Sequence, residues 1–530
     1  MTCSTLTLAP DTHPVPGAGV AAEPDPLIAA QQRGRLFDHP DDLDSALGTG
    51  VHATAMRRAT RPGYDRWIEH VTPAGACTRP VRLTGAIHTV DWRTGRATAT
   101  RPTAAMPDGV IYKACGNRRA SVCPACSQVY RADTYQLVRA GLLGRRNGVP
   151  ATVATHPCAF VTVTAPSFGR VHSTRTDSSG QSRRCRPGRN RRRCPHGVDL
   201  TCNSVHGDGD PLLGVPLCLD CYDHEAQAVW NCFVGELWRR TVEKIKTTLT
   251  RHADHHGEPI RLSYAKCAEM QARAAVHFHA LLRLDGVDPA DPHEIIPPPP
   301  GASLGLLAQA VTDAVRTTHF RTPPHPDHPD GWPIGWGAQL DIKPVRHAVD
   351  GQLTETHVAA YLAKYATKDT EATGHTSVRI TAETIARYAD FAGSHTARLI
   401  SACWRLGRPG ADLDEDQATR NGGRHSYLRL RHWAHMLGYG GHFSTKSRRY
   451  STTLTALRLA RVFWARSNDR ADHQTETTGE LTVVVGVLSY AGSGWHTTGD
   501  ALLANTAAAK AREHRRIVRE EMTHLFTGHY

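Results

Sequence analysis

The stretch that decides the fold of this 530-residue chain is PIRLSYAKCAEMQARAAVHFHALLRL, at residues 259–284. We expect it to form two strands, Pro259–Met270 and Ala275–Leu284, joined by a tight turn at Gln271–Ala274. Because strands joined by so short a turn run antiparallel, this hairpin predicts an antiparallel sheet.

The segments around the hairpin extend this sheet into an α+β fold. On the N-terminal side, Cys158–Ala165 alternates and is rich in β-branched residues, which favours a strand, and His224–Thr250 has a helical period. On the C-terminal side we expect a helix, a strand and a helix at Leu304–Thr318, Ala338–Val345 and Thr354–Thr367. The order strand, helix, strand, strand, helix, strand is that of a ferredoxin-like (RRM-like) antiparallel sheet with helices on one face.

Composition divides the chain further. Residues 1–70 are rich in Pro, Asp, Ala and Gly, and ten of the 14 cysteines lie between Cys115 and Cys232. The regions we expect are a partly ordered leader at 1–105, a cysteine cluster with a helix at 106–157, the sheet core at 158–375 with a zinc- and arginine-rich insertion at 170–223, and a mainly helical, DNA-binding C-terminal region at 376–530.

The charge of the chain favours a polyanionic partner. Its formal net charge is +13, and 54 of its 63 basic residues are arginine, although a GC-rich genome would also enrich arginine. The longest apolar run, Leu481–Leu488, is far shorter than the roughly 20 residues of a membrane span, and no secretory signal begins the chain. We therefore expect a cytoplasmic protein without a membrane partner, whose clustered cysteines are metal ligands rather than disulfides.

Two histidines and a carboxylate form a candidate metal site. His277 and His279 are two apart on a strand and so share one face. If the turn centres on Arg273, Glu269 lies opposite His277, about 5 Å away at Cβ. Two imidazoles and a carboxylate suit Mg²⁺ or Mn²⁺, with positions left open for phosphate oxygens. Gln271 is the rival third ligand, and two histidines on a solvated strand face are the alternative interpretation.

The second chemical element is a helix face. Tyr361, Lys364, Tyr365 and Lys368 stand at i, i+3, i+4 and i+7, and therefore share one side of the helix. Two phenols beside two ammonium groups suit attack on a phosphodiester, since a neighbouring cation helps a phenolate to form. The alternative is a basic helix face with amphipathic tyrosines.

The cysteines suggest two structural zinc sites. Cys115, Cys123 and Cys126 provide three thiolates, and Cys158, Cys185 or a histidine could supply a fourth ligand. For the second site we favour Cys194, Cys202, Cys218 and Cys221, with His196 and His206 as competing ligands. Buried free cysteines are the alternative.

Two basic segments are candidates for contact with DNA phosphates. One is the run Arg183–Arg193, from which we select Arg183, Arg184, Arg191, Arg192 and Arg193. The other is Gly441–Tyr450, with Lys446, Arg448 and Arg449 between helices expected at 425–437 and 452–466, as in helix-turn-helix docking. A solvated loop and a helical hairpin with a polar turn are the respective alternatives. No G-x₄-G-K-[ST] motif is present, so strand separation needs a separate helicase.

Three motifs occur in an order that resembles a known enzyme family. Phe160-Val161-Thr162-Val163-Thr164, His277-Phe278-His279 and Tyr361-x-x-Lys364-Tyr365 are similar to the motifs of HUH endonucleases. Over about residues 110–460 the chain resembles rolling-circle replication initiators of actinobacterial plasmids and integrative conjugative elements, including the phrases CGNRRASVCPAC and GHFSTKSRRYS.

The resemblance implies a function. Tyr365, which matches the nucleophile of relatives with one tyrosine, would attack origin DNA and form a 5′-phosphotyrosyl link, assisted by Lys364 and Lys368. Tyr361 would perform the second cleavage at termination. The implied partners are single-stranded and duplex origin DNA, a host helicase and a polymerase. A conjugative relaxase or HUH transposase would use the same chemistry, and a zinc-containing DNA-binding regulator without catalysis is the alternative of another class.

Overall fold

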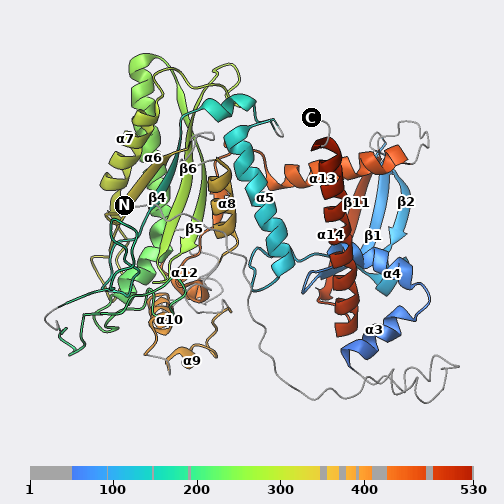
Figure 1. Ribbon diagram of the computed structural model, residues 1–530, viewed down its shortest axis with the longest axis horizontal. Coiled ribbons are helices and arrows are strands. Elements are labelled where there is room, and N and C mark those ends of the chain that lie inside the picture. The colour runs from blue at the N-terminus through green and yellow to red at the C-terminus, as the bar shows by residue number, and fades with distance from the viewer. Residues whose placement is uncertain are drawn as a thin grey trace. The chain divides into compact units, whose positions relative to one another are not determined.

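The computed structural model describes residues 50–91, 94–145, 148–188, 193–345, 355–368, 378–389, 393–408, 426–472 and 482–527 (Figure 1). The chain forms two compact units. The first comprises Arg131–Arg466, and the second comprises Leu6–Tyr130 together with Ser467–Tyr530. The boundaries fall within two helices, α5 (Pro124–Leu143) and α13 (Leu454–Asp472).

A five-stranded antiparallel sheet with the order β10-β5-β6-β4-β9 forms the centre of the first unit. Its strands are β4 (Cys158–Val163), β5 (Ile260–Met270), β6 (Val276–Gly286), β9 (Leu340–Pro344) and β10 (Ser444–Lys446). The expected antiparallel α+β architecture is confirmed. The strand β10 was not expected, because its sequence lies in the segment interpreted as a polar turn between helices.

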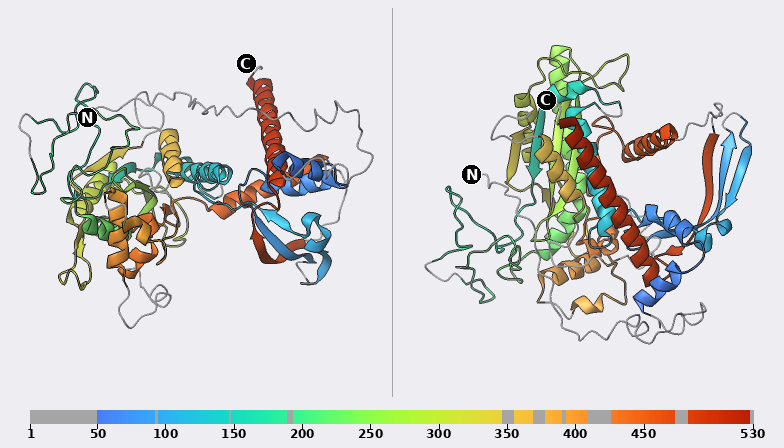
Figure 2. Two further views of the ribbon diagram at one scale, coloured as in Figure 1. Left: turned by 90° about the horizontal axis from the view of Figure 1, so that it is seen from below. Right: turned by 45° about the vertical axis from the view of Figure 1, so that its right-hand side comes forward.

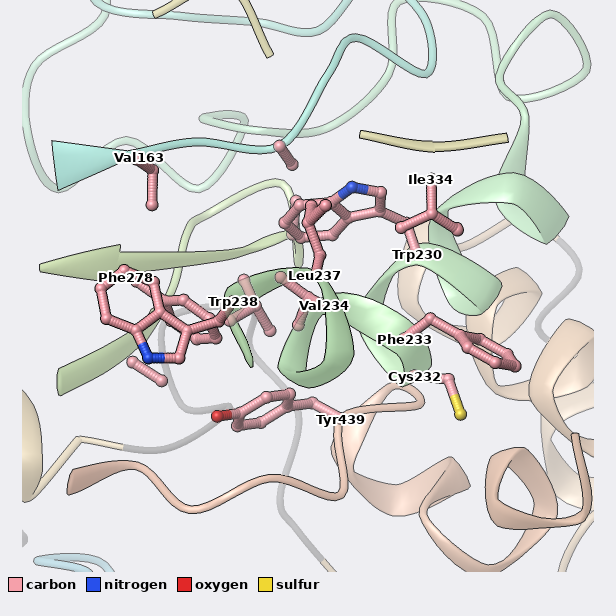
Figure 3. Packing of buried hydrophobic residues seen from close by; sticks show 14 of the residues in the cluster. Val163, Trp230, Cys232, Phe233, Val234, Leu237, Trp238, Phe278, Ile334 and Tyr439 are labelled. Atoms are coloured by element: carbon pink, nitrogen blue, oxygen red, sulfur yellow. The ribbon is translucent and has the colours of Figure 1, made fainter. Parts of the chain in front are cut away.

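Helices α6 (His224–His256) and α7 (Leu304–Thr317) cover one face of this sheet (Figure 1). The alternation of β6 sends Phe278, Ala280, Leu282 and Leu284 to this face, where all four are buried. In Figure 3, side chains of α6 such as Trp230 and Leu237 lie among residues of the sheet and of other elements. The main core of the first unit therefore lies on the side of the sheet away from the two histidines.

The other face of the sheet receives α8 (Glu355–Ala366), which lies next to β5 (Figure 1). Small and apolar side chains of α8, Ala359, Leu362, Ala363 and Ala366, are buried. They allow the helix to approach closely enough for its tyrosines to reach β6.

The β5–β6 turn is held in place by α6. Asn231 donates from Nδ2 to the Ala274 carbonyl at 2.9 Å and accepts at Oδ1 from the Val276 amide at 3.1 Å. Gln227 donates to the Arg273 carbonyl at 2.9 Å. Because these amide side chains are buried in the core helix, the turn is fixed at the position that the sequence predicts, and with it the register of the hairpin.

The remaining elements of the first unit are shorter. They are η4 (Ala151–Thr155), β7 (His319–Arg321), β8 (Pro333–Gly335), α9 (Ala386–Ala389), α10 (His395–Leu406), α12 (Leu428–His432) and η6 (Ala434–Met436). Strands β7 and β8 pair with each other, and α10 packs on α6.

The second unit contains its own antiparallel sheet, in which β1 pairs with β11, β2 and β3. Its elements are α3 (Val51–Ala59), α4 (Tyr64–Val71), η1 (Thr72–Ala74), β1 (Val81–Asp91), β2 (Ala97–Pro102), η2 (Thr103–Ala105), η3 (Pro107–Gly109), β3 (Ile111–Lys113), β11 (Thr482–Ser493) and α14 (Thr498–Thr527). Helix α3 lies beside α14 in both views of Figure 2, and Arg58 of α3 is paired with Asp500 of α14 at 2.7 Å. The described part of the C-terminal region is mainly helical, as expected, but it also contains the long strand β11, which pairs with β1 and was not expected.

None of the helices in the described ranges is long and apolar enough to cross a membrane.

Candidate active site

The side chains of Glu269, His277 and His279 converge at the turn end of the β5–β6 hairpin. The register pairs Glu269 with His277, as the sequence predicts. One carboxylate oxygen, Oε2 of Glu269, lies 2.8 Å from His277 Nε2 and 3.0 Å from His279 Nε2. The three side chains therefore present their ligand atoms to one point, within 4.8 Å of one another.

The other ring nitrogens of the two histidines are held by neighbouring side chains. Nδ1 of His279 lies 3.0 Å from the Thr162 hydroxyl, and Nδ1 of His277 lies 3.1 Å from the Gln271 amide. When Nδ1 of His279 donates a hydrogen bond to the Thr162 hydroxyl, Nε2 is the nitrogen that can bind a metal in place of its hydrogen bond to Glu269. The donor set thus fits a divalent ion. The Gln271 amide lies behind the His277 ring, so Glu269 rather than Gln271 is the third side chain of this group.

Helix α8 places two phenols over the same point. Tyr361 Oη lies 3.3 Å from His279 Nε2, and the rings of Tyr361 and Tyr365 are 4.5 Å apart. Phe160 stacks on the His279 ring at 5.7 Å and meets Tyr361 edge-on at the same distance. This phenylalanine, whose contacts the sequence did not reveal, fixes the histidine relative to the tyrosines.

The two lysines of the helix face lie in different surroundings. Lys368 Nζ lies 4.6 Å from the centre of the Tyr365 ring and 4.0 Å from Glu269 Oε1. Lys364 is exposed to solvent. The structure therefore brings Lys368, rather than Lys364, to Glu269 and the Tyr365 ring.

The electrostatics of the site favour an anionic carboxylate and neutral phenols. Burial alone raises the pKa of Glu269, but hydrogen bonds from His277 and His279 outweigh it and lower the pKa to about 2. Burial raises the pKa of both Tyr361 and Tyr365, and the nearby carboxylate adds to this effect. A phenolate can form here only when a cation offsets the charge of Glu269.

Comparison with known proteins identifies the family. The family described as "Replication initiator protein, pSAM2" (RepSA) matches residues 63–509. A replication initiator protein of Streptomyces ambofaciens is 38% identical over 486 residues, which cover 90% of this chain and 97% of that protein. The chain belongs to this family of replication initiators. No solved structure matches it.

The first cysteine cluster of the initiator contains a fourth thiol that was not predicted from the sequence. Cys77 joins Cys115, Cys123 and Cys126, with Sγ atoms 3.9 Å apart for Cys77 and Cys123 and 3.7 Å apart for Cys115 and Cys126. Cys158 and Cys185, the cysteines considered for this place, lie elsewhere. Cys77 is outside any C-x₂-C pattern and 38 residues before Cys115, so no local spacing marks it.

The second predicted cysteine site of the initiator is wrong in its composition. Cys194, Cys218 and Cys221 do come together, but their fourth neighbour is His196. Cys202 instead lies with a separate set, which also contains His172, Cys185 and His206. The sequence pattern could not separate the two sets, because their members alternate along the chain.

The structure describes three of the five arginines of the insertion that were predicted to contact DNA. Arg183 is exposed and pairs with Asp177 at 2.7 Å, while Arg184 and Arg193 are exposed. Arg191 and Arg192 lie outside the described residues.

The prediction of helix-turn-helix docking around Gly441–Tyr450 is wrong. Residues Ser444–Lys446 form β10, which pairs with β5. The Lys446 ammonium is half-buried and donates to backbone carbonyls, including that of Ser451 at 2.9 Å, so it is not presented to a DNA backbone. Arg449 donates to the His293 carbonyl at 3.1 Å, whereas Arg448 is exposed.

Proposed function

We propose that this initiator nicks one strand of its replication origin through a covalent phosphotyrosyl link, starts rolling-circle replication from the nick, and rejoins the strand at termination. The observation that carries the proposal is the convergence of Glu269, His277 and His279 with the phenols of Tyr361 and Tyr365. The carboxylate and the histidines come from the β5–β6 hairpin, whereas the phenols come from α8, with Tyr361 82 residues after His279.

The topology also supports an HUH endonuclease core. The sheet strands occur along the chain as β4, β5, β6 and β9, with the separate β7–β8 pair before β9, but lie in the order β5-β6-β4-β9, with α6 and α7 in the two crossovers. This is the order of a ferredoxin-like sheet, with its two crossover helices on one face. In the proposal, the opposite face of the two central strands carries the active site.

The covalent step is a transesterification. The Tyr365 oxygen attacks the phosphorus of the scissile phosphodiester, and the bond from phosphorus to the 3′ oxygen breaks. The phenol loses its proton, and the departing 3′ oxygen gains one. One phosphoester bond is exchanged for another, so rejoining needs no nucleotide triphosphate. The free 3′-hydroxyl primes synthesis.

A divalent ion, Mg²⁺ or Mn²⁺, bound by Glu269, His277 and His279 would polarise the scissile phosphate. The chain's own contribution is the position and charge of its side chains. Glu269 orients the histidines, Thr162 holds the tautomer of His279, and Lys368 reduces negative charge beside the Tyr365 oxygen. Tyr361, one turn away on the same helix, is placed to attack in the second cleavage.

The proposal also includes contacts with duplex DNA, two host proteins and a structural zinc ion. The exposed arginines of the insertion would contact phosphates of duplex origin DNA, while the active site holds a single strand. Strand separation and synthesis would be the work of a host helicase and polymerase. The four thiols around Cys77 would hold a structural zinc ion.

The test is denaturing electrophoresis of the protein incubated with Mn²⁺ and an origin oligonucleotide. With a 3′-end label, we expect radioactivity at the mobility of the protein, because the downstream fragment becomes attached through its 5′ phosphate. With a 5′-end label, we expect a shorter free strand. The double variant Tyr361→Phe/Tyr365→Phe is the control and should give neither product. Absence of a protein-linked band with the wild type would overturn the proposal and favour a non-catalytic DNA-binding regulator.

A further inference from the structure

The insertion between β4 and α6 contains eight cysteines and histidines that gather in two groups of four. The groups are His172, Cys185, Cys202 and His206, and Cys194, His196, Cys218 and Cys221. Along the chain, two ligands of the first group are followed by two of the second, then two of the first and two of the second again. Within each group, all four ligand atoms lie within 4.8 Å of one another.

The two recorded distances in the first group are slightly shorter than the edges of a tetrahedron of ligands around zinc. With Zn–S near 2.3 Å and Zn–N near 2.1 Å, ligand atoms on one ion lie about 3.4–3.8 Å apart. Cys202 Sγ is 3.3 Å from His206 Nε2, and His172 Nδ1 is 3.1 Å from the same nitrogen. Both nitrogens of the second pair are atoms that can bind a zinc ion.

A carboxylate orients one ligand of this group from behind. His206 Nδ1 lies 2.6 Å from Asp210 Oδ2, which leaves Nε2 directed at the sulfur and the second imidazole. A carboxylate that accepts from the far nitrogen of a ligand histidine is a regular feature of zinc sites. The Ser173 amide also donates to Cys185 Sγ at 3.3 Å, as expected for a thiolate.

The second group has three thiols and one imidazole. His196 Nδ1 lies 3.2 Å from Cys221 Sγ and 3.8 Å from Cys218 Sγ, so one distance is slightly shorter than the range expected around one ion and the other is at its upper end. Cys194 begins a tight turn, closed by the Gly197 amide at 2.9 Å, which brings His196 back beside it.

We propose that the insertion binds two zinc ions in a crossed arrangement, one in each group. Among the described residues at 164–188 and 193–223, regular structure is limited to isolated bridges and turns, so backbone pairing contributes little to the fold there. In this proposal, metal binding rather than backbone pairing stabilises the fold of the insertion. Since the ligand pairs alternate, each ion closes a loop that contains ligands of the other. This inference does not depend on the proposed nicking activity.

The number of ions is tested by native mass spectrometry of the full chain prepared with zinc as the only added metal. We use the variant His277→Ala/His279→Ala, so that the active site cannot contribute an ion. Three zinc ions per chain are expected, one at the four thiols around Cys77 and two in the insertion. Cys232→Ala, which removes a buried cysteine outside all the groups, should still bind three. Two or fewer ions in the parent variant would overturn the proposal.

The crossed pairing is tested by ¹¹³Cd nuclear magnetic resonance of the cadmium-substituted protein. Sites with four, three and two thiolates should give three resolved resonances. Cys185→His and Cys202→His keep a ligand at each position, and both should shift the resonance of the two-thiolate site. If Cys202→His shifted the three-thiolate resonance instead, neighbouring rather than alternating pairs would share an ion, and the crossed arrangement would be wrong.

Discussion

Glu269 accepts from both histidines through a single oxygen, whereas Gln271 lies on the far side of the His277 ring. The two side chains that compete for the role of third ligand are therefore not equivalent. We expect Glu269→Gln to weaken Mn²⁺ binding by about 100-fold or more, because it removes the charged ligand. Gln271→Ala should weaken it only about 10-fold, as for a residue that orients a ligand. Isothermal titration with Mn²⁺ measures both constants, and a larger effect in Gln271→Ala would reverse the assignment.

The two tyrosines differ in their neighbours. Tyr361 contacts His279, while Lys368 lies over the ring of Tyr365. Because a cation beside a phenol favours its anionic form, we expect Tyr365 to act first. Tyr365→Phe should reduce formation of the covalent adduct at least about 1,000-fold, the scale expected when a nucleophile is removed.

The matched control is Tyr361→Phe. It should form the first adduct at a rate near that of the wild type but fail to transfer the strand to a second origin oligonucleotide. Time courses of adduct and transfer product, followed on denaturing gels, separate the two roles. A reversed pattern would make Tyr361 the first nucleophile.

At the scale of a single element, α8 contains Lys364 and is followed, two residues after its end, by Lys368. Lys368 reaches Glu269 and Tyr365, and Lys364 is exposed. We expect Lys368→Ala to slow adduct formation under saturating DNA by about 100-fold, as for loss of a group that stabilises the transition state. Lys364→Ala should mainly weaken DNA binding. Single-turnover rates over a range of DNA concentrations distinguish the two effects, and equal losses of rate in both variants would contradict this division.

The sheet itself contains a buried ion network on the face that carries the histidines. Arg283 donates to both oxygens of Asp285, at 2.6 and 2.9 Å, and His156 and Ser263 bind the same carboxylate. Removing one partner leaves a buried charge uncompensated, so Asp285→Ala should destabilise the first unit by about 3–5 kcal/mol. Glu243→Ala, which breaks the exposed pair with Lys246 on α6, should cost less than about 1 kcal/mol. Urea unfolding, followed by the fluorescence of the buried tryptophans, gives both values.

The same network predicts a pH dependence. Burial alone raises the pKa of Asp285, but hydrogen bonds from His156 and Arg283 outweigh it and hold the pKa below its usual value. The stabilisation is therefore complete above the unfolded-state value of about 3.9 and is lost as the pH falls through the native pKa. In Asp285→Asn, the free energy of unfolding should depend less steeply on pH below about 4. An unchanged acid dependence would show that other carboxyl groups dominate.

The elements of the core were predictable because their signals are local. The alternation of β4, the hairpin around Gln271–Ala274 and the face of α8 each lie within one short segment of sequence. What could not be predicted depends on distant residues. The strand β10 was interpreted as a turn because its polar residues are typical of loops, and only pairing with β5 makes it a strand. Phe160 likewise gains its importance from contacts with His279 and Tyr361 that sequence spacing does not encode, whereas the spacing on the helix did place Lys368 beside Tyr365.

On the scale of the whole molecule, the fold of the second unit also could not be predicted, because it depends on residues that are far apart in the chain. Its sheet pairs β1 with β11, which are about 400 residues apart in the chain. A composition rich in Pro, Ala and Gly before residue 70 gave no indication of this, and the apolar run in β11 could equally have been a helix segment. Cys77 was missed for a similar reason, because its partners come from a separate segment at 115–126.

The position of Cys77 makes the four-thiol site a connection between segments of the second unit. Cys77 precedes β1, Cys115 follows β3, and Cys123 and Cys126 lie at the start of α5, so one zinc ion would join three parts of the fold. We expect Cys77→Ser to lose one zinc ion per chain and to destabilise this unit by more than about 3 kcal/mol, because binding of a structural zinc ion contributes directly to folding. Hydrogen exchange should then rise in β1 and β3, while the first-unit sheet keeps its protection. Cys232→Ala, in the core of the first unit, is the control and should retain its zinc. Full zinc content in Cys77→Ser would show that three thiols suffice and that the N-terminal segment folds without the metal.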